Sequence, residues 1–317
     1  LLEGRRNIYR VPATYYLGYI AYLHNDFEEA VRLFSDIVDD GHFGVFCSYY
    51  ILESEFMLGD FEYVTAHGEE VSMAVGADMR PRVDRMISEA YYSLGQPEQA
   101  RKWFENYSAS GADMSRKDNY YLGVISYSLQ SYYAAVDAFA EVIGVEDSLA
   151  QSACMHMAGS YLKLKNKHEA LKYYRMASEM DFDKEVKEES YFNYAKLAFD
   201  VNSDIAPFQD YLSLWPENGR SDEIYSYIAT SYLLSRQYKS AVDALERIRS
   251  LTPEMEMNLQ KAAFLRGLEL YGRGAYGAAV SDLRLSLQHS GQNRTLALLA
   301  SFWLAETLYM SGEADEA

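Results

Sequence analysis

The stretch YYLGVISYSLQSYYAAVDAFAEVI, residues 120–143, shows the pattern that decides the fold. An apolar stripe with helical spacing is followed by a short polar break, an aromatic or polar residue, and an alanine with an aromatic residue four positions later. The same pattern returns in YYLGYIAYLHNDFEEAVRLFSDIV, residues 15–38, and in MHMAGSYLKLKNKHEALKYYRMAS, residues 155–178. Two further copies begin at Tyr225 and Ala263. A pattern that returns along most of a chain indicates a repeat architecture.

The alanine of this pattern measures the length of the repeat. Aligned on this alanine column, nine positions follow one another at spacings of 34 to 38 residues: Ala30, Val64, Ala100, Ala135, Ala170, Pro207, Ala241, Ala279 and Ala317. Val64 and Pro207 belong to two copies that keep the pattern less well. Nine positions at this spacing are not expected by chance, so the repeat is the main structural signal of the sequence.

Two more columns connect these copies to a known family. They resemble the tetratricopeptide repeat, a helix–turn–helix unit of about 34 residues. The family's small residue in the first helix is matched by Gly18, Gly123, Ala158, Ala195, Ala229, Gly267 and Ala305. Its aromatic residue in the second helix is matched by Phe34, Phe104, Phe139, Tyr174 and Tyr211. The resemblance implies an all-α fold, an α-solenoid of antiparallel helix pairs that form a right-handed superhelix of about eight and a half repeats.

These columns also have a physical reason. Where two antiparallel helices cross closely, only Gly, Ala or Ser fits at the contact, and aromatic rings fill the space beside it. One helix pair cannot bury its apolar face alone, so neighbouring pairs stack on each other. We therefore expect a single repeat array over residues 1–317.

Two segments, near residues 60–82 and 200–222, depart from the pattern. In the second copy, Val64 and Gly68 stand in the alanine and aromatic columns. In the sixth copy, Pro207 stands in the alanine column. Because proline fits only the first turn of a helix, the second helix of this copy is predicted to start late, and its register is open to a shift of a few residues.

The end of the sequence and its cysteines follow from the same register. Ala317 falls early in a second helix and no polar capping repeat is present, so the chain is expected to be a fragment of a longer protein. Cys47 and Cys154 lie in first helices three repeats apart. Helices pack about 8–10 Å apart and a disulfide needs Cα atoms within about 7 Å, so we expect no bridge between them.

The composition argues against two classes of function. A net charge of −18 opposes the phosphate backbone of nucleic acids, and no basic stripe offsets it, so no nucleic-acid binding is expected. A membrane span needs about 20 mostly apolar residues. The best candidate, LALLASFWLAETLYM at residues 296–310, contains Ser301 and Glu306 and is interpreted as a buried helix. We expect no direct membrane span.

The sequence also lacks the residue patterns typical of enzymes. The six histidines have no metal-ligand spacing, and no phosphate-binding loop occurs. YGRGAYGAAV, residues 271–280, spells the G-x-G-x-x-G of a dinucleotide site, but a helical pattern precedes it and residues 291–301 contain no Asp or Glu. The repeat register instead places Gly274 in a turn between helices, like Gly59 and Gly95. We expect no enzyme activity, no cofactor and no metal site.

Aromatic side chains form the candidate binding surface. Four residues after the small residue, one phase of the first helices carries a ring in seven of nine copies, and further rings precede it on the same side. In the family this concave side commonly contacts peptides, and tyrosine offers a rigid apolar area with a polar tip. The candidate partner-binding residues are Tyr15, Tyr19, Tyr22, Tyr49, Phe56, Tyr92, Tyr120, Tyr127, Phe192, Phe199, Phe264 and Tyr271. The alternative is that these rings only pack the repeats together.

One ligand class of the family is not expected. Members that bind chaperone tails hold the terminal carboxylate with Lys, Asn and Arg on the concave side. The corresponding positions here include Tyr15, Tyr19, Tyr120, Val124, Met155 and Gly159. Arg85 and Lys196 are basic exceptions that lie in different repeats. We therefore expect an extended or helical protein segment that docks by apolar contact, with basic flanks.

Two functions fit this sequence. The first is a non-enzymatic scaffold for protein–protein interaction that binds a peptide or protein segment in the tyrosine-rich groove. The second is a sensory or regulatory array that precedes a catalytic domain, such as a histidine kinase, beyond residue 317. The phrases NYAKLAFD and FWLAETLYM are also similar to long repeat proteins of the Bacteroidetes cell envelope, which implies a bacterial periplasm or envelope location. No oligomeric state is predicted.

Overall fold

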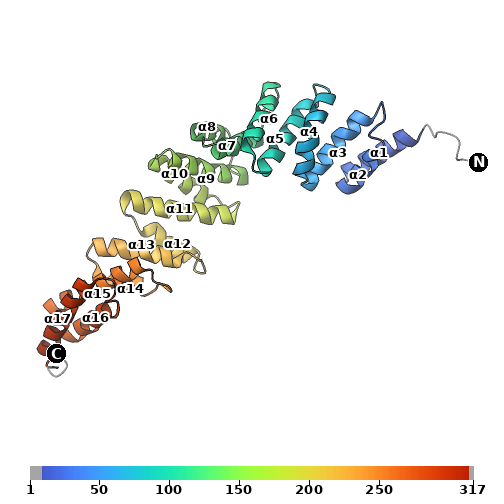
Figure 1. Ribbon diagram of the computed structural model, residues 1–317. Coiled ribbons are helices and arrows are strands. Elements are labelled where there is room, and N and C mark those ends of the chain that lie inside the picture. The colour runs from blue at the N-terminus through green and yellow to red at the C-terminus, as the bar shows by residue number, and fades with distance from the viewer. Residues whose placement is uncertain (1–8, 314–317) are drawn as a thin grey trace, which may run out of the picture. The chain divides into compact units, whose positions relative to one another are not determined.

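The computed structural model describes residues 9–313, which form seventeen α-helices and no strand (Figure 1). The chain divides into two compact units, Leu1–Lys187 and Glu188–Ala317. The helices of the first unit are α1 (Arg10–Leu23), α2 (Phe27–Ser35), α3 (Gly44–Leu58), α4 (Phe61–Ala74), α5 (Arg80–Ser93), α6 (Pro97–Ala109), α7 (Arg116–Ser128), α8 (Tyr132–Ala140), α9 (Ser148–Lys163) and α10 (Lys167–Glu179).

The second unit begins inside the next helix. Its helices are α11 (Lys184–Asn202), α12 (Ala206–Leu214), α13 (Ser221–Leu234), α14 (Tyr238–Leu245), α15 (Pro253–Gly272), α16 (Tyr276–Gln288) and α17 (Arg294–Ser311). Odd-numbered helices are the first helices of the predicted repeats and even-numbered helices are the second. The described residues therefore hold eight pairs and one further first helix, which confirms the predicted all-α repeat fold. Ala317 lies outside the described residues.

The alanine column is buried in every repeat that the structure describes. Ala30, Val64, Ala100, Ala135, Ala170, Pro207, Ala241 and Ala279 are all buried. The small-residue column packs against the aromatic column of its own repeat, as expected. A Cβ atom placed on Gly123 would lie 2.5 Å from Cε1 of Phe139, and one on Gly267 would lie 2.8 Å from Cγ of Leu283. Close helix crossing thus depends on the missing side chain.

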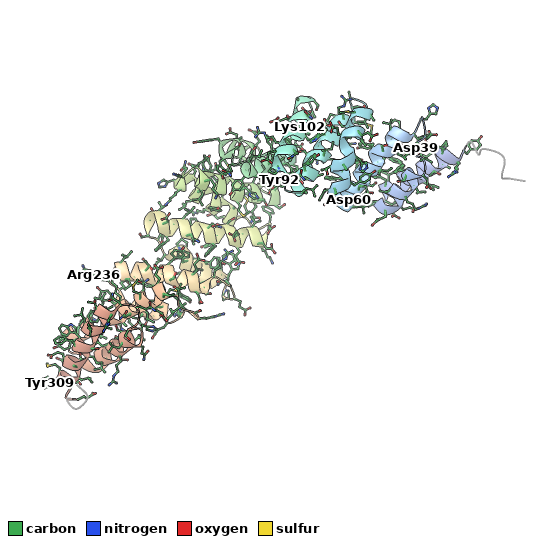
Figure 2. All side chains as sticks on the ribbon, viewed as in Figure 1. Asp39, Asp60, Tyr92, Lys102, Arg236 and Tyr309 are labelled. Atoms are coloured by element: carbon green, nitrogen blue, oxygen red, sulfur yellow. The ribbon has the colours of Figure 1, made fainter. Side chains whose placement is uncertain are left out.

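Each turn between the two helices of a repeat contains one residue with a left-handed backbone. These residues are Asn25, Gly59, Gly95, Gln130, Lys165, Ser203, Arg236, Gly274 and Gly312. Arg236, labelled in Figure 2, holds this place in the seventh repeat. Gly274 has φ +75°, so the glycine-rich stretch at residues 271–280 is one more of these turns, as predicted. Glycine adopts this conformation at no steric cost.

The second repeat exchanges the sizes of two columns. Leu52 stands in the small-residue column of α3, and Gly68 stands in the aromatic column of α4. The space at Gly68 is taken by the next repeat, because a Cβ atom there would lie 2.5 Å from Cγ1 of Ile87 on α5. Leu52 and Ile87 are both buried in one core cluster. The departure seen in the sequence is therefore a size exchange between neighbouring repeats.

The sixth repeat has a late second helix. α12 begins at Ala206, one residue before Pro207, whereas α8 begins at Tyr132, three residues before Ala135. The left-handed turn residue, Ser203, also lies one position later than the repeat spacing gives. Pro207 is in the first turn of its helix, where a proline is tolerated because that N–H needs no partner within the helix.

The structure also bears on the expectations for the two cysteines and for a membrane span. Cys47 and Cys154 form no disulfide, as predicted, and both are buried. Burial raises the pKa of both thiols to about 11, so they stay protonated and unreactive near neutral pH. Within residues 9–313, no helix is long and apolar enough to cross a membrane.

Candidate partner-binding surface

All twelve candidate residues lie on first helices, namely α1, α3, α5, α7, α11 and α15. Three of them, Tyr49, Phe192 and Phe264, are buried in separate core clusters. The other nine are partly exposed, and none is fully open to solvent. The array itself therefore covers a large part of the predicted surface.

Most of the partly exposed rings contact a ring of the following first helix. Tyr22 on α1 lies 5.1 Å from Tyr50 on α3, and Tyr127 on α7 lies 6.3 Å from His156 on α9 (ring centroids). The second unit repeats this arrangement. There Phe199 on α11 lies 5.3 Å from Tyr227 on α13, and Tyr271 on α15 lies 5.2 Å from Trp303 on α17. Such contacts stabilise the stacking of repeats by about 0.5–1.5 kcal/mol each beyond the area they bury.

Tyr50 is held by three candidate rings at the start of the chain. Its ring lies 6.4 Å from Tyr15, 5.4 Å from Tyr19 and 5.1 Å from Tyr22. Burial, and secondarily the Glu53 carboxylate, raises the pKa of Tyr22 to about 12. Burial also raises the pKa of Tyr50 to about 12. These phenols therefore remain neutral and serve as apolar packing surface with a hydrogen-bonding tip.

His156 occupies the equivalent place in the fifth repeat. Its imidazole is stacked on Phe139, 5.7 Å away at an interplanar angle of 14°, and lies 6.0 Å from Tyr120. Burial lowers the pKa of His156, so the ring is neutral at pH 7. In the sequence this histidine has no metal-ligand spacing, and its ring contacts show that it packs successive repeats.

Cations of the array cover Phe192 in the second unit. The Arg220 guanidinium lies 4.3 Å from the ring centroid and the Lys196 ammonium 5.2 Å from it. Arg220 also pairs with Glu189 at 2.5 Å, and Lys196 pairs with Glu223 at 2.9 Å. Phe192 is thus occupied by cation–π contacts within the chain.

A cavity between first helices remains open in the first unit. It has a volume of about 260 Å³ and is lined only by residues of α3, α5 and α7. Phe56, Met57 and Met86 form its apolar part, and Met57 is 56% exposed. Phe56 is the one candidate residue among those that line it.

Charged side chains line the rest of this cavity. Arg82, Arg85 and Lys117 contribute positive charge, and Glu53 and Glu89 negative charge. Arg85 is committed within the chain, because its Nε lies 2.8 Å from Glu89 and 3.3 Å from Asp118. The cavity is therefore lined by apolar side chains together with charges of both signs.

Three solved structures resemble this fold. The C-terminal part of a TPR repeat-containing protein from Cytophaga hutchinsonii superposes with a TM-score of 0.59 at 14% identity, over 75% of this chain and 95% of that chain. A tetratricopeptide repeat protein from Parabacteroides merdae gives 0.43 at 14% identity, over 88% and 98% of the two chains. A Rap protein complexed with Competence and Sporulation Factor gives 0.41 at 12% identity, over 96% and 99%.

The chain has the fold of a tetratricopeptide repeat protein. No family model matches the sequence, and no curated protein matches it, so no catalytic family is identified. Among residues 9–313, no group of three or more His, Cys, Asp or Glu side chains could hold a metal ion. Tetratricopeptide repeats commonly mediate protein–protein interaction through surfaces formed along the stack.

One further column of the repeats packs successive first helices together and was not predicted from the sequence. Two residues before the small-residue column, several first helices carry a ring that contacts an aromatic ring of the preceding first helix. These residues are Tyr50, His156, Tyr227 and Trp303. The signal was present as a ring at a fixed offset in most copies.

Proposed function

We propose that this protein is a non-enzymatic scaffold that binds a protein segment in the first-helix cavity of the first unit. The observation that carries the proposal is an open cavity on the first-helix side of a tetratricopeptide repeat fold, where the predicted aromatic stripe leaves Phe56 partly uncovered. Most other rings of the stripe already pack successive repeats.

The chemistry of the cavity supports an apolar anchor. Phe56, Met57 and Met86 offer a ring and two flexible thioether chains, which adapt to different side chains. A volume of about 260 Å³ is enough for one or two side chains rather than a whole ligand. The partner is therefore a segment that inserts an apolar residue and continues along the neighbouring first helices.

A displayed peptide library tests this proposal. Peptides selected on the full chain are measured by isothermal titration against the wild type, Met57→Ser and Tyr133→Ser. Met57 and Tyr133 are 56% and 76% exposed, so neither substitution removes core packing. Tyr133 lies on the second helix α8 and is the matched control. We expect Met57→Ser to weaken binding at least tenfold and Tyr133→Ser to leave it unchanged.

Two results would contradict the proposal. One is that the selected peptides bind Met57→Ser as tightly as the wild type. The other is that they lose affinity for Tyr133→Ser instead, which would place the binding surface on the second helices. The regulatory alternative concerns chain beyond the described residues, and no observation within them favours it.

A further inference from the structure

Buried carboxylates single out a second site. Four acidic side chains of the described residues are buried: Asp84, Glu89, Asp118 and Asp282. Glu89 and Asp118 lie within 2.8 Å and 3.3 Å of Arg85, and Asp282 lies 3.1 Å from Arg266. Asp84 is 4% exposed, and among residues 9–313 it has no cation within 4.0 Å. A buried charge without a partner is costly, so its place in the fold calls for an explanation.

The immediate partners of Asp84 are few. Ser72 on α4 donates its hydroxyl to Asp84 Oδ1 at 2.6 Å. Arg80 is the cation whose charge acts on Asp84, but its Nε donates to the Ser72 carbonyl oxygen at 3.0 Å. Arg80 favours the charged form of Asp84 only through space, and burial outweighs it and raises the pKa of this carboxyl. The carboxylate thus has one hydrogen bond where a paired one usually has several.

Asp84 lines a large cavity. This cavity has a volume of about 640 Å³ and lies against α4, the first turn of α5, and α6. α5 packs against both second helices, which are adjacent to it in Figure 1. Trp103 on α6 and Met73 on α4 supply its apolar wall, and Met73 is 70% exposed. Glu69 and Lys102 carry opposite exposed charges beside it, and Figure 2 labels Lys102.

We propose that this cavity binds an arginine side chain of a partner protein, with its guanidinium paired to Asp84 and stacked on Trp103. The site lies mainly on second helices and is therefore separate from the first-helix cavity of the proposed function. The overall charge of −18 favours a basic partner.

The chemistry of the two walls selects arginine. A guanidinium binds a carboxylate by paired hydrogen bonds and stacks on the face of an indole, which is the aromatic side chain that attracts cations most strongly. Lysine would reach Asp84 as a point charge without the planar stacking. Arg80 also lines the cavity, and the positive charges of Arg80 and Lys102 balance the negative charges of Glu69 and Asp84. Because Arg80 donates to the Ser72 carbonyl oxygen, Asp84 is the buried lining carboxylate that an occupant meets.

The test uses Trp103 as its own reporter. The chain has three tryptophans, and in the Trp215→Phe/Trp303→Phe variant of residues 1–317 Trp103 is the only tryptophan, so it is excited selectively at wavelengths that tyrosine does not absorb. The probes are the capped tripeptides acetyl-Gly-Arg-Gly-amide, acetyl-Gly-Lys-Gly-amide and acetyl-Gly-citrulline-Gly-amide. Citrulline keeps the shape of arginine without its charge. We expect a saturable change of Trp103 fluorescence with the arginine peptide and an affinity at least tenfold lower with citrulline.

Two variants with the same change of net charge test whether arginine binding depends on Asp84. Asp84→Asn removes the charge with little change of shape, and we expect it to weaken arginine binding at least tenfold. Asp78→Asn makes the same change of net charge at an exposed residue that does not line the cavity, and binding should be unchanged. The lysine peptide should bind between the other two.

Three results would overturn the proposal: no saturable change with the arginine peptide, equal binding of arginine and citrulline, or equal binding by the wild type and Asp84→Asn. If circular dichroism shows that Asp84→Asn is not folded, the tryptophan-reporter protein itself decides. Its arginine affinity should then fall on acidification from about pH 7 to about pH 4, as Asp84 gains a proton. An affinity that stays constant over this range would also overturn the proposal.

Discussion

The second and fourth repeats build the same helix crossing with opposite sizes. In the fourth, Gly123 on α7 receives the ring of Phe139 on α8. In the second, Leu52 on α3 is the large residue, Gly68 on α4 is the small one, and Ile87 of the next repeat fills the space. The fourth repeat completes this joint alone, whereas the second depends on its neighbour. The comparison shows that the helix crossing requires a certain total side-chain volume, which can be divided in different ways among the positions that meet there.

The largest effect is expected from enlarging the small side of the fourth repeat. Gly123→Leu would force a side chain into Phe139 and should destabilise this repeat by about 3 kcal/mol. Hydrogen exchange of α7 and α8 amides measures the loss locally.

The exchange variant Gly123→Leu/Phe139→Gly sharpens this test. It copies the sizes of the second repeat and should recover only part of the loss, because the fifth repeat has Met157 where the third has Ile87. Full recovery would show that the neighbour contributes nothing to the joint. A loss equal to the sum of the two single variants would show that the two positions are not coupled.

The second-largest effect on stability is expected from removing the charge of a buried carboxylate, and this effect should differ between Asp118 and Asp84. Asp118 on α7 accepts hydrogen bonds from Tyr107 at 3.1 Å and Ser115 at 2.6 Å and pairs with Arg85. Asp118→Asn should cost about 2–3 kcal/mol in urea unfolding at pH 7, a value reduced by the partial exposure of Arg85.

Asp84→Asn should instead be neutral or stabilising at pH 7. Burial raises the folded-state pKa of Asp84 above its unfolded value, so the folded protein binds more protons. Its stability therefore falls as pH rises through that interval, and Asp84→Asn should remove this fall. A strong loss of stability in Asp84→Asn at pH 7 would show that a cation of the chain stabilises the charged form of Asp84.

A smaller effect is expected in the turns. The second repeat has Gly59 at its left-handed position, with φ +83°, and the fourth has Gln130, with φ +59°. Gln130→Gly should stabilise the fourth repeat by about 1 kcal/mol, and Gly59→Ala should destabilise the second by a similar amount. Thermal unfolding followed by circular dichroism measures both. Equal melting temperatures for all three proteins would exclude backbone strain at these turns.

The smallest change is expected at His156, where the fourth and fifth repeats meet. Burial lowers its folded-state pKa, so the unfolded chain binds the proton more readily. The rings that face it, Tyr120, Tyr127 and Phe139, supply no carboxylate. Its contribution to stability is present above about pH 6.5 and is lost as pH falls below that value. The urea concentration at the midpoint of unfolding should therefore change less between pH 7 and pH 5.5 for His156→Phe than for the wild type.

The sequence predicted the helix pairs because the spacing of the alanine column is independent of the partner of each residue. Gly274 was assigned to a turn for the same reason, and its backbone confirms this. The use of the aromatic stripe was harder to predict. The exposure of Tyr22 and Tyr127 depends on a ring of the next first helix that packs against each of them. That ring lies about 30 residues further along the sequence. The cavity beside Asp84 was not predicted either, because it arises from helices that one repeat does not contain.

The contact between Gly68 and Ile87 limits how this gene can be rearranged. Arrays of this kind grow and shrink when whole repeats are duplicated or lost, since each repeat touches only its neighbours. A copy that closes its own joint, like the fourth, can be inserted or removed as a single module. The second copy lacks that freedom, because separating it from the third would leave a hole at Gly68 that no side chain of its own fills. Repeats two and three are therefore expected to be inherited as one block.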